Sequence, residues 1–266
     1  MYKTFFGFRE KPFSKTPDPR FLFMSRGHQE ALARLEFVAE EREIAVLSGE
    51  IGCGKTTLSR ALMDRLGSHY RFCYILNPRL NPVEFLRTIA RILEVEEPAM
   101  AKDTLIHQIH CAVYAAHQAG ICPVLVVDEA QMISNFEVFD EIRLLTNFQL
   151  DDRNLLGVII MGQPELRPML SLDRFEPLRQ RISLHYHLLP LEVDELMEYL
   201  DFRLIAAGGP PGLFTPDAVQ RLFELTGGVP RRINSMATNA LLVAYGHDAA
   251  LIDSGIINEI KDEAML

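Results

Sequence analysis

A short stretch, GEIGCGKTT from Gly49 to Thr57, constrains this chain more than any other feature. It has the form GxxxxGK[ST], and it stands between an apolar stretch, Ile44 to Ser48, and a helix-like pattern, Thr56 to Leu66. Glycines allow backbone torsions that turn consecutive N–H groups inward, and the N-terminus of the next helix adds partial positive charge. The chain is therefore expected to hold phosphate oxygens in a strand–loop–helix unit.

Within this loop, the backbone is expected to surround the phosphates while two side chains act on them. Lys55 is placed to reach the β- and γ-phosphates, and the Thr56 hydroxyl is placed to ligate Mg²⁺. The predicted nucleotide-binding residues of the loop are Gly49, Glu50, Ile51, Gly52, Cys53, Gly54, Lys55, Thr56 and Thr57.

A second candidate site is the sequence PVLVVDEAQ, Pro123 to Gln131, in which an apolar strand ends in two carboxylates. Asp128 is expected at the carboxyl edge of a sheet, where it can hold Mg²⁺ through water. Glu129 follows, beside the expected γ-phosphate, and can polarise an attacking water. Together with the phosphate loop, the pair favours an ATPase that uses ATP and Mg²⁺ over a protein that only binds nucleotide.

Strand-like and helix-like patterns alternate up to about Leu189. Alternation of this kind indicates a parallel sheet covered by helices on both faces. The expected strands cover 44–48, 72–76, 124–127, 155–161 and 182–188, and the expected helices cover 56–66, 82–95, 104–119 and 137–148.

After Leu189 only helix-like patterns remain. Thr215 and Pro216 form an N-cap followed by proline at the first helical position, a typical helix start. The expected helices cover 192–207, 215–227, 230–244 and 254–263. We therefore predict an α/β domain over residues 1–189, with five parallel strands, and an all-helical domain over residues 190–266.

Composition excludes several classes of protein. The 266 residues carry a formal net charge of −9, so sequence-independent binding to DNA phosphates is not expected. No apolar run approaches the roughly 20 residues of a membrane-spanning helix, and the N-terminus lacks the uninterrupted apolar core of a secretory signal. The expected location is therefore the cytoplasm. Reduced, mostly buried thiols are expected for the four scattered cysteines, Cys53, Cys73, Cys111 and Cys122.

Several motifs together resemble the AAA+ ATPases: the spacing of the two sites above, the strand LLGVIIMGQPEL, the segment LRQRI and the turn GGVPRRIN. More narrowly, the opening FFGFREKPFSKTPDPRFLFMSRGHQEALARL and the pair DEAQ and GQPEL resemble the ExeA/GspA family of secretion-associated ATPases. This resemblance implies an AAA+ P-loop NTPase fold with a C-terminal helical lid. Because transposition regulators of the TniB/TnsC kind share the module, the resemblance indicates the ATPase better than its partner.

Four further residues acquire roles from this resemblance. Gln163, at the end of the fourth strand, matches the sensor-1 position, where an amide can hydrogen-bond the γ-phosphate or the attacking water. Arg179 and Arg181 lie in the region that supplies an arginine finger to the neighbouring subunit; either could reach across, and one could instead pair with Glu176. Arg231 matches the sensor-2 arginine, which reports the nucleotide state to the lid.

The N-terminal segment also has a counterpart in such ATPases. Pro12, Phe13 and Pro17 match residues that pack against the adenine base, although ordinary core packing is an equally open role for them. The nearby aromatic residues are expected to be packing anchors: Phe5, Phe6, Phe8, Phe21 and Phe23.

Two functions follow from the resemblance. The favoured one is an ATP-driven protein of secretion or cell-envelope type, which forms a nucleotide-dependent homo-oligomer. It would act on a membrane-associated partner at the inner face of the bacterial inner membrane, reached through that partner or through a tail outside this chain. The alternative is an ATP-dependent, DNA-binding regulator of transposition that recruits a transposase. The acidic net charge counts against it, and the cluster Arg65, His69 and Arg71 is too small to decide.

Overall fold

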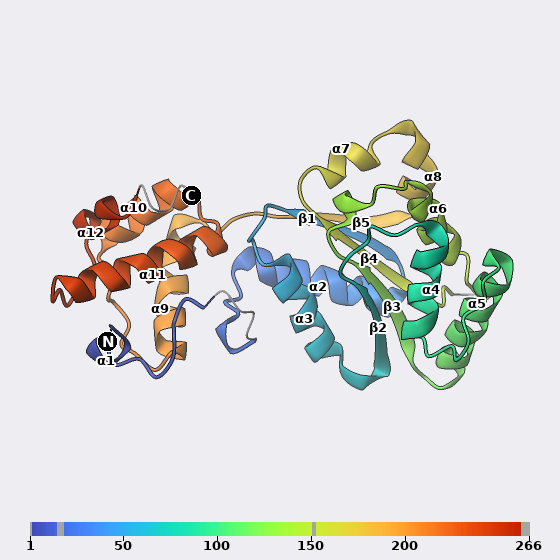
Figure 1. The fold of residues 1–266 in the computed structure, drawn as a ribbon, viewed down its shortest axis with the longest axis horizontal. Helices are drawn as coiled ribbons and strands as arrows, with labels where there is room; N and C mark the ends of the chain where they lie inside the picture. The colour runs from blue at the N-terminus through green and yellow to red at the C-terminus, as the bar shows by residue number, and fades with distance from the viewer. Residues whose placement is uncertain (1, 15–18, 151–152, 262–266) are drawn as a thin grey trace. The chain divides into compact units, whose positions relative to one another are not determined.

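The computed structural model describes residues 2–14, 19–150 and 153–261. The chain forms two compact units (Figure 1). The α/β unit contains Gln29–Gly49 and Leu58–Leu188. The helical unit contains Met1–His28, Glu50–Thr57 and Leu189–Leu266, so it includes the phosphate loop.

A parallel sheet of five strands forms the centre of the α/β unit, in the order β2-β3-β4-β1-β5. The strands are β1 (Ile44–Gly49), β2 (Tyr70–Ile75), β3 (Cys122–Val127), β4 (Gly157–Gly162) and β5 (Ile182–Leu188). Every residue of β1, β3 and β4 is buried. Helices on both faces of a parallel sheet require such continuous apolar strands. The predicted five-stranded parallel sheet is thus confirmed.

Helices cover the sheet on both sides (Figure 1). They are α2 (Arg26–Glu41), α3 (Lys55–Leu66), α4 (Pro82–Ile92), α5 (Lys102–Gln118), α6 (Glu137–Leu145), α7 (Leu166–Leu170) and α8 (Glu176–Arg179). The helices α4, α5 and α6 share a core with alternate strand residues such as Val46, Leu125 and Ile160. The helices α2 and α3 lie against the opposite side of the sheet (Figure 1).

The helical unit has a core of its own. It contains α1 (Tyr2–Phe5), a 3-10 turn (Pro19–Phe21), α9 (Val193–Ala206), α10 (Pro216–Thr226), α11 (Pro230–Gly246) and α12 (Ser254–Glu259). Phe6, Phe8 and Phe21 are buried in this core, as expected of packing anchors, and Phe23 packs against it while partly buried. Phe5 differs, because it is 42% exposed and lies edge-to-face with Tyr245.

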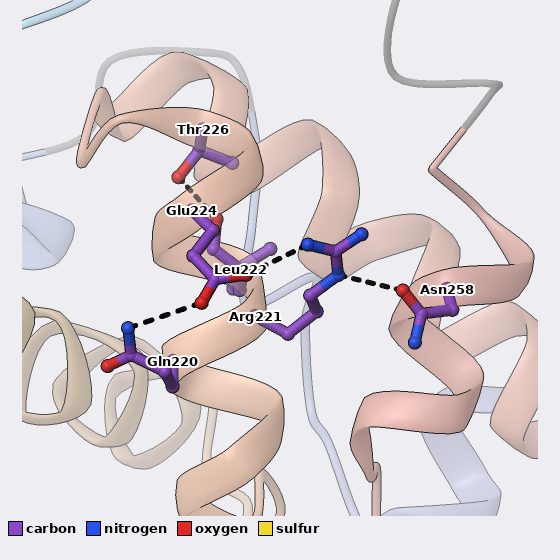
Figure 2. A network of polar contacts seen from close by, with 6 residues as sticks. All are labelled: Gln220, Arg221, Leu222, Glu224, Thr226 and Asn258. Carbon is purple, nitrogen blue, oxygen red and sulfur yellow. Dashed lines mark hydrogen bonds and ion pairs between the residues drawn. The ribbon is translucent and has the colours of Figure 1, made fainter.

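Polar contacts join α10 to α12 (Figure 2). Arg221 donates from Nε to Asn258 Oδ1 at 2.7 Å and from Nη1 to Glu224 Oε2 at 2.8 Å. At the start of α10, Thr215 occupies the N-cap as predicted, but its hydroxyl donates to the carbonyl of Ile252 at 3.1 Å and does not cap the helix.

Contacts place the N-terminal segment with the C-terminal helices. The buried guanidinium of Arg203 on α9 donates to three backbone carbonyls of that segment: Pro12 at 2.7 Å, Ser14 at 3.2 Å and Phe21 at 3.4 Å. The sequence pattern had assigned residues 1–28 to the first domain, because it could not reveal these long-range contacts. The domain boundary at residue 189 stays a prediction.

Within the described ranges, 2–14, 19–150 and 153–261, no helix is both long enough and apolar enough to cross a bilayer. All four thiols are free, and Cys53, Cys73 and Cys122 are buried while Cys111 is exposed.

Candidate nucleotide site

The phosphate loop follows β1 and turns sharply because two of its glycines have positive φ angles. Gly52 has φ +90° and Gly54 has φ +97°, a region that side chains disfavour. Space is also limited: a Cβ at Gly52 would lie 2.5 Å from Cβ of Arg231, and one at Gly54 would lie 3.0 Å from Nε2 of His28. Both torsion and packing therefore require glycine at these two positions.

Lys55 begins α3 and extends back over the loop. Its Nζ donates to the backbone carbonyl of Glu50 at 3.1 Å, and the residue is only 5% exposed. Thr56, its neighbour at the helix start, is partly buried. Burial raises the pKa of the Cys53 thiol to about 11, so this thiol keeps its proton at neutral pH. A lysine held over a helix N-terminus provides the charge and the donors that bind an anion.

Two consecutive carbonyl groups of the loop accept hydrogen bonds from other parts of the helical unit. The carbonyl of Gly52 accepts from the backbone N–H of Arg231, in the first turn of α11, at 3.3 Å. The carbonyl of Cys53 accepts from Nε2 of the buried His28 at 2.9 Å. The backbone N–H and the Cβ of Arg231 thus lie next to the loop. The sequence predicted a role for Arg231 but none for His28.

Asp128 lies directly after β3 and is 2% exposed. Its Oδ2 accepts from the hydroxyl of Tyr74 on β2 at 2.9 Å, and its Oδ1 accepts from the backbone N–H of Glu129 at 2.8 Å. Tyr74 also contacts Ser59 of α3 at 3.0 Å. Burial, with the Asp128 carboxylate as a smaller cause, raises the pKa of Tyr74, so the phenol keeps its proton and stays a donor. These contacts fix the direction of the carboxylate.

Glu129 has a left-handed backbone, with φ 51°, which a non-glycine residue rarely adopts. Its Oε2 accepts from Nε2 of Gln131 at 2.5 Å and from Nε2 of Gln163 at 3.0 Å. The side-chain oxygen of Gln131 also accepts from the backbone N–H of Gln163 at 3.0 Å. The structure thus brings Glu129 and Gln163 together, with Gln131 as a third member that was not predicted.

The carboxyl ends of β1, β3 and β4 lie at one edge of the sheet, since these strands are parallel neighbours. Ligands of open α/β sheets bind outside this edge. The buried Asp128 carboxylate in the α/β unit and the Thr56 hydroxyl in the helical unit are each an oxygen ligand of the kind that Mg²⁺ prefers, so each residue by itself fits this ion. The loop by itself can bind an anion.

The two predicted finger arginines lie near the start of β5. Arg179 donates from Nη1 to the carbonyl of Leu170 at 3.2 Å, and its Nη2 lies 3.9 Å from Oε2 of Glu176, the ion pair that the sequence allowed for one of them. Arg181, which is exposed, donates from Nη1 to Thr146 Oγ1 at 2.9 Å. Their role toward a neighbouring subunit stays a prediction.

Of the segment matched to the adenine side, Pro12 and Phe13 are both buried, and Phe13 lies edge-to-face with Phe214 in the core of the helical unit. Core packing thus accounts for Phe13. Pro17 lies outside the described residues.

Comparison with known proteins gives one family and several structural neighbours. A family model described as an AAA domain matches residues 38–170. General secretion pathway protein A of Aeromonas hydrophila is 40% identical over 260 residues, which make up 97% of this chain and 47% of that protein. The chain therefore spans about half the length of this relative. The predicted resemblance to the ExeA/GspA family is confirmed.

Solved structures share the fold at lower identity. The Aeropyrum pernix ORC1 protein in complex with DNA is 19% identical with a TM-score of 0.68, over 96% of this chain and 69% of that chain. The Aeropyrum pernix ORC2 protein, in ADPNP-ADP complexes, is 18% identical with a TM-score of 0.69, over 97% of this chain and 72% of that chain. These likenesses confirm the AAA+ fold class. With half of its residues matched by the family model and this fold around the phosphate loop, the chain belongs to the AAA domain family.

Proposed function

We propose that this chain binds ATP with Mg²⁺ and hydrolyses it, and that assembly of several copies drives or regulates a secretion or cell-envelope complex. The observation that carries the proposed hydrolysis is the position of Glu129, held by the amides of Gln131 and Gln163 at the carboxyl end of the sheet. An ATP-binding protein without turnover has no need of a carboxylate oriented in this way.

Binding is assigned to the loop and the start of α3. The backbone N–H groups that follow Gly52 and Gly54 surround the phosphates, and Lys55 supplies a cation to the β- and γ-phosphates. The Thr56 hydroxyl and the Asp128 carboxylate would hold Mg²⁺, and the ion would neutralise charge on the phosphate oxygens. The contacts of Tyr74 keep the Asp128 carboxylate directed for this task.

Hydrolysis is assigned to Glu129 and Gln163. The Glu129 carboxylate accepts a proton from the attacking water and orients it toward the γ-phosphorus. Gln163 donates from Nε2 to Oε2 of Glu129 at 3.0 Å. In the proposed sensor-1 role, the same amide donates to the γ-phosphate or to the water. Arg179 or Arg181 of a neighbouring copy would neutralise the charge that develops on the γ-phosphoryl group, and Arg231 would report nucleotide state to the C-terminal helices.

The secretion or envelope assignment rests on the relative named General secretion pathway protein A, of which this chain spans 47%. We propose that the protein works at the inner face of the bacterial inner membrane, through a membrane-associated partner or a further segment. Binding to DNA has less support, because Arg65 is paired with Glu36 at 2.6 Å and Arg71 with Glu94 at 3.0 Å. These ion pairs reduce the positive charge available to DNA phosphates.

Two variants and a control test the ATPase. Lys55→Ala should lose affinity for ATP, whereas Glu129→Gln should keep that affinity and lose turnover. Glu137→Gln, which changes an exposed carboxylate at the start of α6, should leave both unchanged. Equilibrium binding and phosphate release measure the two properties. Native turnover in Glu129→Gln would refute the catalytic assignment, and native binding in Lys55→Ala would refute the phosphate site.

A further inference from the structure

We infer that His28 is a positioning residue for the phosphate loop, which holds the carbonyl of Cys53 and thereby directs the N–H of Gly54 toward the phosphates. This inference rests on the proposed binding of ATP. His28 is 4% exposed, and it belongs to the first turn of α2.

The hydrogen bonds of His28 define its tautomer. Nε2 lies 2.9 Å from the carbonyl oxygen of Cys53, which can only accept, so Nε2 carries the proton and donates. Nδ1 lies 2.7 Å from Oγ of Ser25 and accepts from this hydroxyl. Burial lowers the pKa of His28, so the ring stays neutral at neutral pH and keeps this arrangement.

Peptide geometry connects this bond to the ligand side of the loop. The carbonyl of Cys53 and the N–H of Gly54 belong to one planar trans peptide, so they point in opposite directions. Holding the carbonyl on the side of His28 therefore turns the N–H away from the ring. The φ angle of Gly54, +97°, lies next to this peptide, and a Cβ there would come within 3.0 Å of Nε2. The imidazole thus lies against the loop backbone at Gly54, where the positive φ angle already favours glycine.

The position of His28 is itself fixed from two directions. Ser25 Oγ accepts from the backbone N–H of His28 at 3.3 Å, an N-cap contact at the start of α2. Arg26, between them, donates from its backbone N–H to Oε1 of Glu195 at 2.9 Å and from its side chain to Asp194 at 2.8 Å. Both acceptors lie in the first turn of α9. The ring therefore sits on a helix start that α9 and Ser25 hold in place, as a positioning role requires.

Two amide variants distinguish the hydrogen bond made by Nε2 of His28 from the one made by Nδ1. In His28→Gln the amide nitrogen reaches about as far as Nε2, so it can still donate to the carbonyl of Cys53. In His28→Asn the shorter amide reaches only the level of Nδ1, so the Cys53 carbonyl loses its donor. Without this donor, the peptide between Cys53 and Gly54 is no longer held with its N–H directed toward the phosphates. We expect His28→Asn to weaken binding of ATP and ADP by roughly tenfold, and His28→Gln to stay within about threefold of the parent.

The measurement is isothermal titration calorimetry with Mg²⁺ and ADP or a slowly hydrolysed ATP analogue, and separately with adenosine. Adenosine lacks phosphates, so its affinity should be equal in the Gln and Asn variants. Thermal unfolding without ligand should show that both variants are folded at the temperature of the titration. A merely structural role would instead lower all three affinities together.

The outcomes are distinguishable. If the parent protein binds neither ADP nor the ATP analogue, the proposed function fails and the inference fails with it. If the parent binds them but His28→Asn binds as tightly, only the inference is refuted. Should His28→Asn not fold, Ser25→Ala removes the hydroxyl that orients the ring and leaves Nε2 in place. It should weaken ADP binding while leaving adenosine binding unchanged, and equal affinity for ADP would overturn the inference.

Discussion

Replacing Gly52 by alanine tests the close approach between the phosphate loop and the start of α11. The new Cβ would lie 2.5 Å from Cβ of Arg231, whereas ordinary contacts begin at 3.4 Å, so the backbones must separate by about 0.9 Å. The positive φ angle of Gly52, +90°, adds strain to any L residue at this position.

The two costs can be separated by a matched variant. Gly212 has a similar φ angle, +74°, and belongs to the same helical unit, but a Cβ there would meet nothing within 4 Å. Gly212→Ala should therefore show the strain alone, about 1–2 kcal/mol of unfolding free energy. Gly52→Ala should show the strain together with an overpacking cost of about 1–3 kcal/mol, a total of about 2–5 kcal/mol.

Urea unfolding at pH 7.5 measures the free energies, and calorimetric titration with ADP measures binding. Gly52→Ala should also lose affinity for ADP, because the loop must move away from α11, whereas Gly212→Ala should bind as the parent does. Equal unfolding free energies in the two variants, together with unchanged ADP affinity in Gly52→Ala, would show that the loop does not pack against α11 as described.

Three further predictions concern pH, assembly and DNA. Burial lowers the pKa of His28 and His185 below the ordinary value of about 6.5. The contribution of each neutral ring to the free energy of unfolding is therefore complete above about pH 6.5 and is lost as pH falls. Urea unfolding should give a lower free energy of unfolding at pH 5.5 than at pH 7.5, and the difference should be smaller in His28→Gln. Sedimentation velocity of Glu129→Gln should show oligomers only when ATP is present, and a monomer in every nucleotide state would contradict an arginine finger that acts between subunits. Replacing Arg179 or Arg181 by alanine should lower the rate of ATP hydrolysis by about 10³-fold or more. ATP-bound Glu129→Gln should bind duplex DNA weakly or not at all by fluorescence anisotropy, since the net charge is −9, and micromolar affinity near physiological salt would favour the transposition alternative.

The sheet could be predicted from the sequence because its central strands are buried on both faces. Such strands appear as continuous apolar runs, as in β1 and β3. The ends of the helices and strands were predicted less accurately. The helix expected over 82–95 ends at Ile92, and the chain then turns through Glu94 with φ +64°. Leu155 and Leu156 are buried by packing and lie outside β4, although their apolar character suggested a strand.

One long helix, α2, was not predicted. Its buried residues Ala31, Leu35 and Val38 do recur at helical spacing, but the segment is rich in charged residues and carries Gly27 in its first turn. The spacing of the apolar residues was enough to predict this helix, whereas the many charged residues made the segment look like a loop.

Candidate site residues could be predicted from the sequence where they belong to one short motif. Lys55 and Thr56 belong to one motif, and Asp128 and Glu129 belong to another, so sequence spacing alone made them candidates, and their roles stay predictions. His28 and Tyr74 reach the site only by tertiary contact: His28 contacts Cys53 25 residues later, and Tyr74 contacts Asp128 54 residues later. No periodic pattern encodes such a pairing. Gln131 had a weaker signal, since it closes the sequence DEAQ.

The contacts of Arg203 bear on how far this protein can be shortened. A version that starts at Arg26 would retain both phosphate-site motifs, yet it would remove Phe6, Phe8, Phe13 and Phe21 from a core whose other members come from the C-terminal helices and the segments that connect them. Arg203 would lose three carbonyl acceptors at the same time, and a buried guanidinium is costly without them. Such a truncated protein should expose an apolar surface on α9 and its neighbours and become prone to aggregation and proteolysis. The residues before the first motif are therefore part of the minimal folded protein.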